Sequence, residues 1–410
     1  MNITKSKIPL SIWAIGFASM LLNISTVMMF GVVALYLKQI IGAGTGFIVM
    51  LEGFFEAMAF VMKLASGLIS DYFRRPKKIM LVGFSMVAIS RPIFALCATV
   101  PMVIIARLFD RLGNGVQSTP RDALVGDLSP ERAKGACFGL RNTMATAGSF
   151  IGGGLGFVAM YIFDLSYQQV FMWASFPASI GFILLLIFVN DPHEKEVTAE
   201  KKPIRHPLHL KDLRRLGKPY WLLMVVAMVF MSSRIGESML VLHATQSFGM
   251  DPSFSHGILI LYNCTNSLFS YPVGVLSDKL GRYGFLALSF VLLIVADAFL
   301  GFANSLPVML IGVGLWGIQI GMSQDMFLCI IADQIPEDLR GTGIGFYYLI
   351  NSIGLLLAGF IGGLLADKYD QFVTFMGSGV IALLALVLLV VLRPTIDVKK
   401  KRYFKLITKH

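Results

Sequence analysis

The chain has 410 residues and a formal net charge of +11 at pH 7. Apolar residues make up 56% of it and charged residues only 14%, with a mean hydropathy of +0.74. This composition excludes a soluble nucleic-acid-binding protein, because the chain contains repeated apolar runs long enough to cross a bilayer, which takes about 20 helical residues. The sequence therefore predicts an all-α membrane protein, since helices satisfy their own backbone hydrogen bonds in lipid.

Twelve membrane-spanning helices are predicted in chain order. They cover residues 9–37, 45–70, 79–98, 101–127, 135–163, 167–190, 219–247, 253–277, 284–303, 306–333, 341–366 and 371–393. The longest hydrophilic stretch, residues 191–218, separates the sixth span from the seventh. We therefore expect a six-helix bundle over 1–190, a cytoplasmic linker over 191–218, a second six-helix bundle over 219–393 and a basic cytoplasmic tail over 394–410.

Positive charge predicts the topology. Lys and Arg crowd the loops at one side, including residues 74–78, 132–134 and 195–218, whereas the alternate loops carry chiefly Lys38 and Lys368. Because basic loops stay in the cytoplasm, both termini are expected inside. The chain is then expected to be a multi-pass membrane protein.

An internal repeat organises the two bundles. GLISDYFRRPKK (Gly67–Lys78) recurs as GVLSDKLGR (Gly274–Arg282), 207 residues later. DLSPERAKG (Asp127–Gly135) recurs as DQIPEDLRG (Asp333–Gly341), 206 residues later. Two motifs that recur in order at nearly one offset indicate two copies of a unit of roughly 200 residues, and therefore pseudo-symmetric bundles of the kind found in transporters.

The repeated loop resembles the signature G-x-x-x-D-x-x-G-R-R/K of the major facilitator superfamily (MFS). Arg74 stands where the signature has glycine in the first copy, and the second copy fits better. ARLFDRLGNG (Ala106–Gly115) resembles the fourth-helix motif R-x-x-x-G-x-G, with Arg111 in place of the first glycine. The resemblance covers essentially the whole chain and points to a bacterial branch of uncertain substrate. It implies a secondary transporter that acts as a monomer by alternating access.

The same resemblance implies a cytoplasmic gating latch. In the family, the acid of the loop lies at the start of a helix in the other half, and the base pairs with an acid that ends the fourth helix. Carried over, Asp71 and Asp278 face the eleventh and fifth spans near Gly341 and Gly135. The implied ion pairs are Arg75 with Asp127 and Arg282 with Asp333.

Ionisable side chains within the spans are the candidates for proton coupling. Each costs about 2.5–3.5 kcal/mol at the centre of a membrane helix, so each must pair or face water. The candidates are Glu52, Glu56, Arg107, Glu237 and Asp325. Glu52 and Arg107 lie at similar depth and are equally well read as a structural bridge. Glu56 is nearer the middle of its span, where a carboxylate is better placed to carry a proton.

Polar side chains at a common depth predict a substrate cavity. They are Asn23, Arg111, Arg234, Asn263, Gln319, Tyr347 and Asn351. Each alone is as well explained by a helix–helix hydrogen bond. Arg234 and Glu237, three residues apart, could likewise satisfy each other. The intramembrane arginines favour an anionic or zwitterionic solute, such as a carboxylate metabolite or siderophore.

Motifs of other classes are missing from the sequence. There is no phosphate-binding loop of the Walker type and no His/Cys spacing for a metal, so neither a cofactor nor enzyme activity is expected. The predicted partners are a small-molecule substrate, protons and the lipid bilayer, without nucleic acid. A multidrug/proton antiporter that exports lipophilic compounds is the main alternative. A non-transporting membrane sensor is a remote one.

Overall fold

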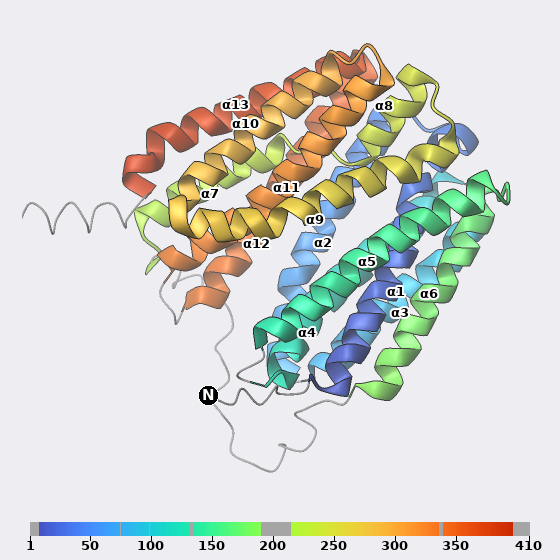
Figure 1. Ribbon diagram of the computed structural model, residues 1–410, viewed down its shortest axis with the longest axis horizontal. Helices are drawn as coiled ribbons and strands as arrows, with labels where there is room; N and C mark the ends of the chain where they lie inside the picture. Colours follow the sequence, from blue (N-terminus) through green and yellow to red (C-terminus); the bar gives the residue numbers. More distant parts are fainter. Residues whose placement is uncertain are drawn as a thin grey trace, which may run out of the picture. The chain divides into compact units, whose positions relative to one another are not determined.

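The computed structural model describes residues 8–73, 75–97, 99–130, 134–189, 215–335 and 339–396. Within these ranges the chain forms thirteen α-helices (Figure 1). They are α1 (Leu10–Leu35), α2 (Thr45–Phe73), α3 (Pro76–Leu96), α4 (Val100–Leu128), α5 (Lys134–Tyr161), α6 (Tyr167–Phe188), α7 (Lys218–Ser232), α8 (Ser238–Phe248), α9 (Ser255–Leu280), α10 (Arg282–Gly301), α11 (Leu306–Gln334), α12 (Arg340–Lys368) and α13 (Gln371–Ile396). Most of the predicted linker and tail lies outside the described residues.

Eight of these helical segments are long and apolar enough to cross a membrane. Their surfaces support that role. On α13, Val380, Leu384 and Val391 are exposed by 66%, 53% and 67%. Such a continuous apolar surface is uncommon on a soluble protein and suits contact with lipid. The remaining long helices include α2 and α4, which carry several of the charges that the sequence places inside spans.

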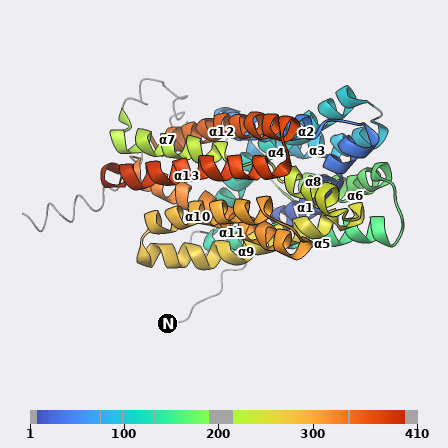
Figure 2. The same ribbon diagram turned by 90° about the horizontal axis from the view of Figure 1, so that it is seen from above.

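The prediction of twelve helices is wrong in one place. The seventh predicted span, 219–247, is interrupted, so that α7 ends at Ser232 and α8 begins at Ser238. Both views show α7 and α8 as separate helices (Figures 1 and 2). The intervening backbone makes tight turns instead of helical bonds, with Ile235 N–H donating to the Ser233 carbonyl at 3.1 Å. The mostly polar stretch 232–238, which contains Gly236, favours such a break.

The helices pack as two units. Unit 1 comprises Met1–Ala43, Met58–His206 and Met250–Ile260, and unit 2 comprises Gly44–Ala57, Pro207–Gly249 and Leu261–His410. Each half of the sequence therefore contributes a short segment to the other unit. These segments include the beginnings of α2 and α9, which the repeat offset of 207 relates to each other. The exchange thus follows the internal repeat.

The packing inside each unit also repeats. In unit 1, α1 packs on α5 and α6, and α3 packs on α4 and α6. In unit 2, α7 packs on α12 and α13, and α10 packs on α11 and α13, which flank it in both views (Figures 1 and 2). The repeat relates α1 to α7, α3 to α10, and α4, α5 and α6 to α11, α12 and α13. The predicted pseudo-symmetry is therefore present in the helix contacts.

Glycines let the exchanged part of α2 approach α12 closely in unit 2. A Cβ added at Gly53 would lie 2.5 Å from the Cα of Gly359, and one added at Gly46 would lie 2.1 Å from the Gly363 carbonyl oxygen. Gly46 N–H also donates to Asp367 Oδ1 at 2.7 Å, which places a carboxylate at the start of α2. Close backbone approach at small residues is a common way to join helices in a membrane.

Candidate functional site

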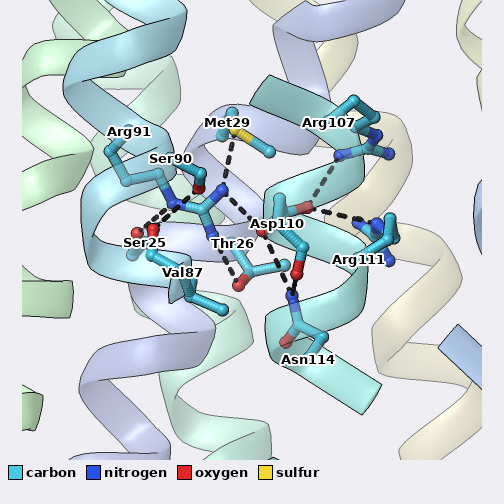
Figure 3. Close-up of polar contacts among 10 residues, drawn as sticks. All are labelled: Ser25, Thr26, Met29, Val87, Ser90, Arg91, Arg107, Asp110, Arg111 and Asn114. Carbon is cyan, nitrogen blue, oxygen red and sulfur yellow. Dashed lines mark hydrogen bonds and ion pairs between the residues drawn. The ribbon is translucent and has the colours of Figure 1, made fainter. Parts of the chain in front are cut away.

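The arginine cluster of unit 1 consists of Arg91, Arg107, Asp110 and Arg111. Its centre is the Asp110 carboxylate on α4, which is fully buried. Arg91 Nη1 from α3 lies 2.8 Å from Asp110 Oδ1, and Arg107 Nη1 lies 3.3 Å from Oδ2. Arg111 Nε lies 3.2 Å from the same Oδ2. Figure 3 shows the three guanidinium groups converging on this one carboxylate.

Polar groups of α1 complete the surroundings of Arg91, whose side chain is fully buried. Its Nε donates to Ser25 Oγ at 2.9 Å, and Nη2 donates to Thr26 Oγ1 at 3.2 Å (Figure 3). Because Arg91 therefore bonds to both α1 and α4, it ties three helices together. A buried charge is tolerated only when paired and hydrogen-bonded, and this one meets both conditions.

Arg107 and Arg111 also lie over one aromatic ring. Their guanidinium carbons are 4.7 and 5.2 Å from the centre of the Phe30 ring. A cation over an aromatic face contributes about 0.5–2 kcal/mol, and more when desolvated. Arg107 was predicted to act in proton coupling and Arg111 to line the cavity. Both contact Asp110 and Phe30, and both predicted roles stay predictions.

The break between α7 and α8 carries the second polar group, in unit 2. We call Glu52, Glu56, Arg234, Glu237 and Tyr262 the break cluster. Glu52 is 5% exposed, and the Ser238 N–H donates to its Oε2 at 3.1 Å. A carboxylate from α2 therefore caps the first turn of α8, where the helix dipole favours negative charge.

Glycine at position 236 makes room for this carboxylate. A Cβ added at Gly236 would lie 2.2 Å from Glu52 Oε2, closer than real Cβ contacts. The sequence allowed two interpretations of Glu52 and Arg107, a structural bridge between them or a role in proton coupling. In the structure Glu52 accepts a hydrogen bond from the α8 backbone and Arg107 pairs with Asp110. The bridge between Glu52 and Arg107 stays a prediction.

Glu237 and Arg234 have different partners. The Tyr262 hydroxyl from α9 is hydrogen-bonded to the Glu237 side chain, and the charges of Glu237, Arg234 and Glu56 all act on it. Arg234 Nη1 lies 3.7 Å from Met231 Sδ. Among the described residues Arg234 forms no ion pair, and its buried Nε has no hydrogen-bond partner. A guanidinium held at a helix break in this way suits an anionic ligand.

Two buried amides of unit 2 also retain unsatisfied acceptors. Gln319 on α11 is fully buried, and its Nε2 donates to Ser323 Oγ at 3.0 Å. Its Oε1, and Oδ1 of the 1% exposed Asn351 on α12, have no hydrogen-bond partner within the described ranges. Buried polar atoms of this kind are rare and call for a bound water or ligand. Both residues were predicted to line the cavity.

The remaining predicted residues are Tyr347, Asn23 and Asn263 of the cavity and Asp325 of the proton-coupling set. Tyr347 is buried between Phe327 and Tyr348, with ring centres 6.0 and 5.8 Å away. Asn23 on α1 and Asn263 on α9 are half-buried. The Asp325 side chain, predicted for proton coupling, lies outside the described residues.

One of the two latch pairs is present in the structure. Arg282 Nη1 lies 2.8 Å from Asp333 Oδ2, the pairing that the family resemblance implies. Arg75 and Asp127 are both exposed, and their pairing stays a prediction. The side chains of Asp71 and Asp278 lie outside the described residues. The gating role of all six residues stays a prediction.

Asp297 on α10 is a buried acid that sequence reasoning missed. It is fully buried, Trp316 Nε1–H donates to its Oδ1 at 3.2 Å, and Ser378 Oγ lies 2.5 Å from its Oδ2. With the repeat offset of 206 residues, Asp297 is equivalent to Arg91 and Trp316 is equivalent to Asp110. Aligning the two halves of the sequence could therefore have identified Asp297 as a candidate.

Capping of α8 by Glu52 has a measurable consequence. Glu52→Ala should lower stability by about 0.5–2 kcal/mol, because it leaves the Ser238 N–H without its acceptor. Glu52→Gln keeps an acceptor oxygen and should cost less. Thermal unfolding of the two purified variants compares these values. Equal losses would show that the charge of Glu52, and not its hydrogen bond to Ser238, stabilises the break.

Comparison with known proteins agrees with this architecture. The family profile of the Major Facilitator Superfamily matches residues 15–241 and 222–407. An uncharacterized MFS-type transporter of Methanocaldococcus jannaschii is 26% identical over 391 residues, covering 92% of this chain and 94% of that protein. The quinolone resistance protein NorA of Staphylococcus aureus is 21% identical over 365 residues, covering 85% and 88%. The crystal structure of a point mutant of the nucleoside transporter NupG superposes with a TM-score of 0.74 at 13% identity, covering 94% and 99%.

Proposed function

Because the chain belongs to the Major Facilitator Superfamily and is a transporter, not an enzyme, we propose that it is a secondary active transporter that moves a small solute by alternating access. It crosses the bacterial inner membrane twelve times, with α7 and α8 together forming one interrupted pass. Both termini lie in the cytoplasm, and the protein acts as a monomer. The two repeated units, each built from the same helix contacts, support this arrangement.

The interrupted pass is the observation that carries the proposal. Discontinuous helices in transporters expose backbone groups and helix ends to substrate and coupling ions, and irregular backbone is tolerated at membrane depth only where protein or water surrounds it. Here the break presents Arg234 and Glu237, and receives Glu52 from α2. The break cluster is therefore our proposed site of solute binding and proton coupling.

Coupling to protons is assigned to the carboxylates of the break cluster. Glu56 and Glu237 both act on the buried Tyr262 hydroxyl. Two acids near one hydroxyl offer a place where a proton can move between groups as the break changes shape. Arg234, in the same break, responds to the charge of these acids. Asp325 and Arg107 are kept as further candidates.

An anionic or zwitterionic solute is the substrate class that suits Arg234. Its Nε is buried without a hydrogen-bond partner among the described residues, and a carboxylate would satisfy it. The buried acceptors Gln319 Oε1 and Asn351 Oδ1 complement the donors of a zwitterion, such as an ammonium group. A carboxylate metabolite or siderophore therefore fits better than a neutral sugar.

Multidrug/proton antiport is the second candidate. It is favoured by the similarity to NorA, whose name attaches it to quinolone resistance. In that case Glu52 and Glu56, one helical turn apart on α2, would attract a lipophilic cation. The two functions differ in which groups of the break cluster bind the solute, because an anion needs the arginine and a lipophilic cation needs the acids.

A thermal-stability screen of the purified protein separates the two candidates. A solute that binds only the folded state at about 100 times its Kd adds about 2.7 kcal/mol of stability. Stabilisation by carboxylates that is lost in Arg234→Ala supports the anion transporter. Stabilisation by lipophilic cations that is lost in Glu56→Gln supports the antiporter and contradicts the first proposal.

We also propose that the Arg282–Asp333 pair acts in gating more than in stability. The two side chains are 27% and 38% exposed, so the pair should contribute only about 0–1 kcal/mol. Arg282→Ala should therefore leave the unfolding temperature nearly unchanged while slowing transport. The exchange Arg282→Asp with Asp333→Arg should restore part of the rate. A large loss of stability in Arg282→Ala would instead make the pair a structural contact.

A further inference from the structure

The buried acid Asp297 stands apart from the break cluster in the chain but reaches the same break. Ser378 on α13 lies between them. Its Oγ is 2.5 Å from Asp297 Oδ2 and 2.6 Å from the carbonyl oxygen of Ser233, the residue at which α7 gives way to the break. Asp297, Ser378 and Ser233 therefore form a continuous chain of short oxygen–oxygen contacts.

Counting hydrogens along this chain decides the state of the acid. Two short oxygen–oxygen contacts need two hydrogens, one for each. The Ser378 hydroxyl supplies one, and a carbonyl oxygen supplies none. The second hydrogen must therefore come from the Asp297 carboxyl group. In this arrangement Asp297 Oδ2–H donates to Ser378 Oγ, and Ser378 Oγ–H donates to the Ser233 carbonyl.

The surroundings of Asp297 agree with a neutral acid. Its side chain is fully buried, and among the described residues no cation contacts it. The helices packed on α10 include α11 and α13, which present Trp316 and Ser378 to the acid, and α7, whose Phe230 ring stacks on Phe290 of α10. On α8, His243 Nε2 contacts the Leu300 carbonyl of α10 at 3.0 Å, not Asp297. An isolated carboxylate in such a place is much costlier than the protonated form.

Arg91 of unit 1 is the repeat equivalent of Asp297, and comparing the two residues shows how the units differ. Arg91, 206 residues earlier, is also buried, also bonds to the next helix (Asp110) and also reaches the first helix of its half through Ser25 and Thr26. That junction is held by fixed opposite charges, because an arginine does not lose its proton in proteins. In unit 2 an acid, which can lose its proton, stands at the equivalent position.

We propose that Asp297 is a proton-binding site of this transporter, protonated in the conformation seen here, and that its proton holds the α7–α8 break in place through Ser378 and the Ser233 carbonyl. Loss of the proton would turn the Ser378 hydroxyl toward the carboxylate and leave the Ser233 carbonyl facing a lone pair. The backbone just before Arg234 and Glu237 would then be released. The binding of a proton by Asp297 does not depend on the proposed function. Only the use of that proton to drive transport rests on it.

Infrared spectroscopy of the purified full-length protein at neutral pH tests the protonation. A protonated carboxylic acid has a carbonyl stretch that an ionised carboxylate lacks and that shifts in D2O. The difference spectrum of wild type minus Asp297→Asn should contain this band. Asp122→Asn is the matched control, because Asp122 pairs with Arg121 and Arg141 and should give no such band. Absence of the band from the Asp297 spectrum would overturn the proposal.

Hydrogen exchange tests the link to the break. Peptides covering residues 233–240 should exchange several-fold faster in Ser378→Ala than in wild type, because the Ser233 carbonyl loses its donor. Asp297→Asn should exchange as slowly as wild type, since its amide N–H also donates to Ser378 Oγ. Equal exchange in wild type and Ser378→Ala would overturn the link.

Both measurements are independent of transport. They need neither a solute nor a proton gradient, so failure of proton-coupled transport would leave them unchanged. Conversely, an ionised Asp297 would remove this proposal but leave transport resting on Glu52, Glu56 and Glu237. The two failures are therefore distinguishable.

Discussion

Asp110→Ala is expected to lower the stability of the protein by about 3–5 kcal/mol, the usual cost of removing one partner from a buried ion pair. The carboxylate is fully buried, and Arg91, which loses its 2.8 Å partner, is also fully buried. Arg107 and Arg111 lose the same acceptor, so three neighbouring guanidinium groups would lose the carboxylate that they share. Thermal unfolding in detergent measures the loss.

Asp122→Ala is the matched control for this prediction. Asp122 lies on the same helix and also contacts two arginines, Arg121 at 3.1 Å and Arg141 at 2.9 Å. Its side chain is 43% exposed, however, so its removal should cost less than about 1 kcal/mol. Adding Arg91→Met to Asp110→Ala should recover part of the stability, because one uncompensated charge is then gone. Similar losses in the two alanine variants would show that burial of the cluster has no energetic consequence.

Gly53→Val is expected to have the second largest effect, through the close approach of α2 to α12 in unit 2. The new Cβ would meet the Cα of Gly359 at 2.5 Å and the Leu355 carbonyl oxygen at 2.8 Å. Both are backbone atoms, so no side chain can move aside, and the helices must separate. Overpacking of this kind costs about 1–3 kcal/mol. Separation would also disturb Glu52, the neighbouring residue that caps α8.

Gly154→Val is the control for the glycine prediction. Gly154 is also a helical glycine within a predicted span, but a Cβ there would meet nothing within 4 Å. Both changes add the same β-branched side chain, so the intrinsic helix penalty is equal. Gly53→Val should therefore lower the unfolding temperature, and Gly154→Val should leave it nearly unchanged. Equal shifts would assign the effect to helix propensity and not to the α2–α12 contact.

The sequence by itself determined the class of protein, the order of the helices and the repeat. Apolar runs are local features, so helices follow eleven of the twelve predicted spans within a few residues. The family resemblance, carried to the second half by the repeat, also implied the Arg282–Asp333 contact. Family membership follows from the same residues, since the loop motif and the fourth-helix motif lie within the matched ranges.

Only the tertiary structure decided which buried charges meet. Arg91, Arg107 and Arg111 were all visible as intramembrane arginines, but their common partner depends on the rotation of α3 and α4 about their axes, which helical periodicity does not specify. The interruption of the seventh span escaped for a similar reason. The polar residues around Gly236 favour a break but lie inside a mainly apolar stretch that also fits one helix. Only the folded structure places the Glu52 carboxylate beside Gly236, where it caps a new helix start. Asp297 acquires its meaning only through Ser378 and Ser233, which are distant in the chain and adjacent in the fold.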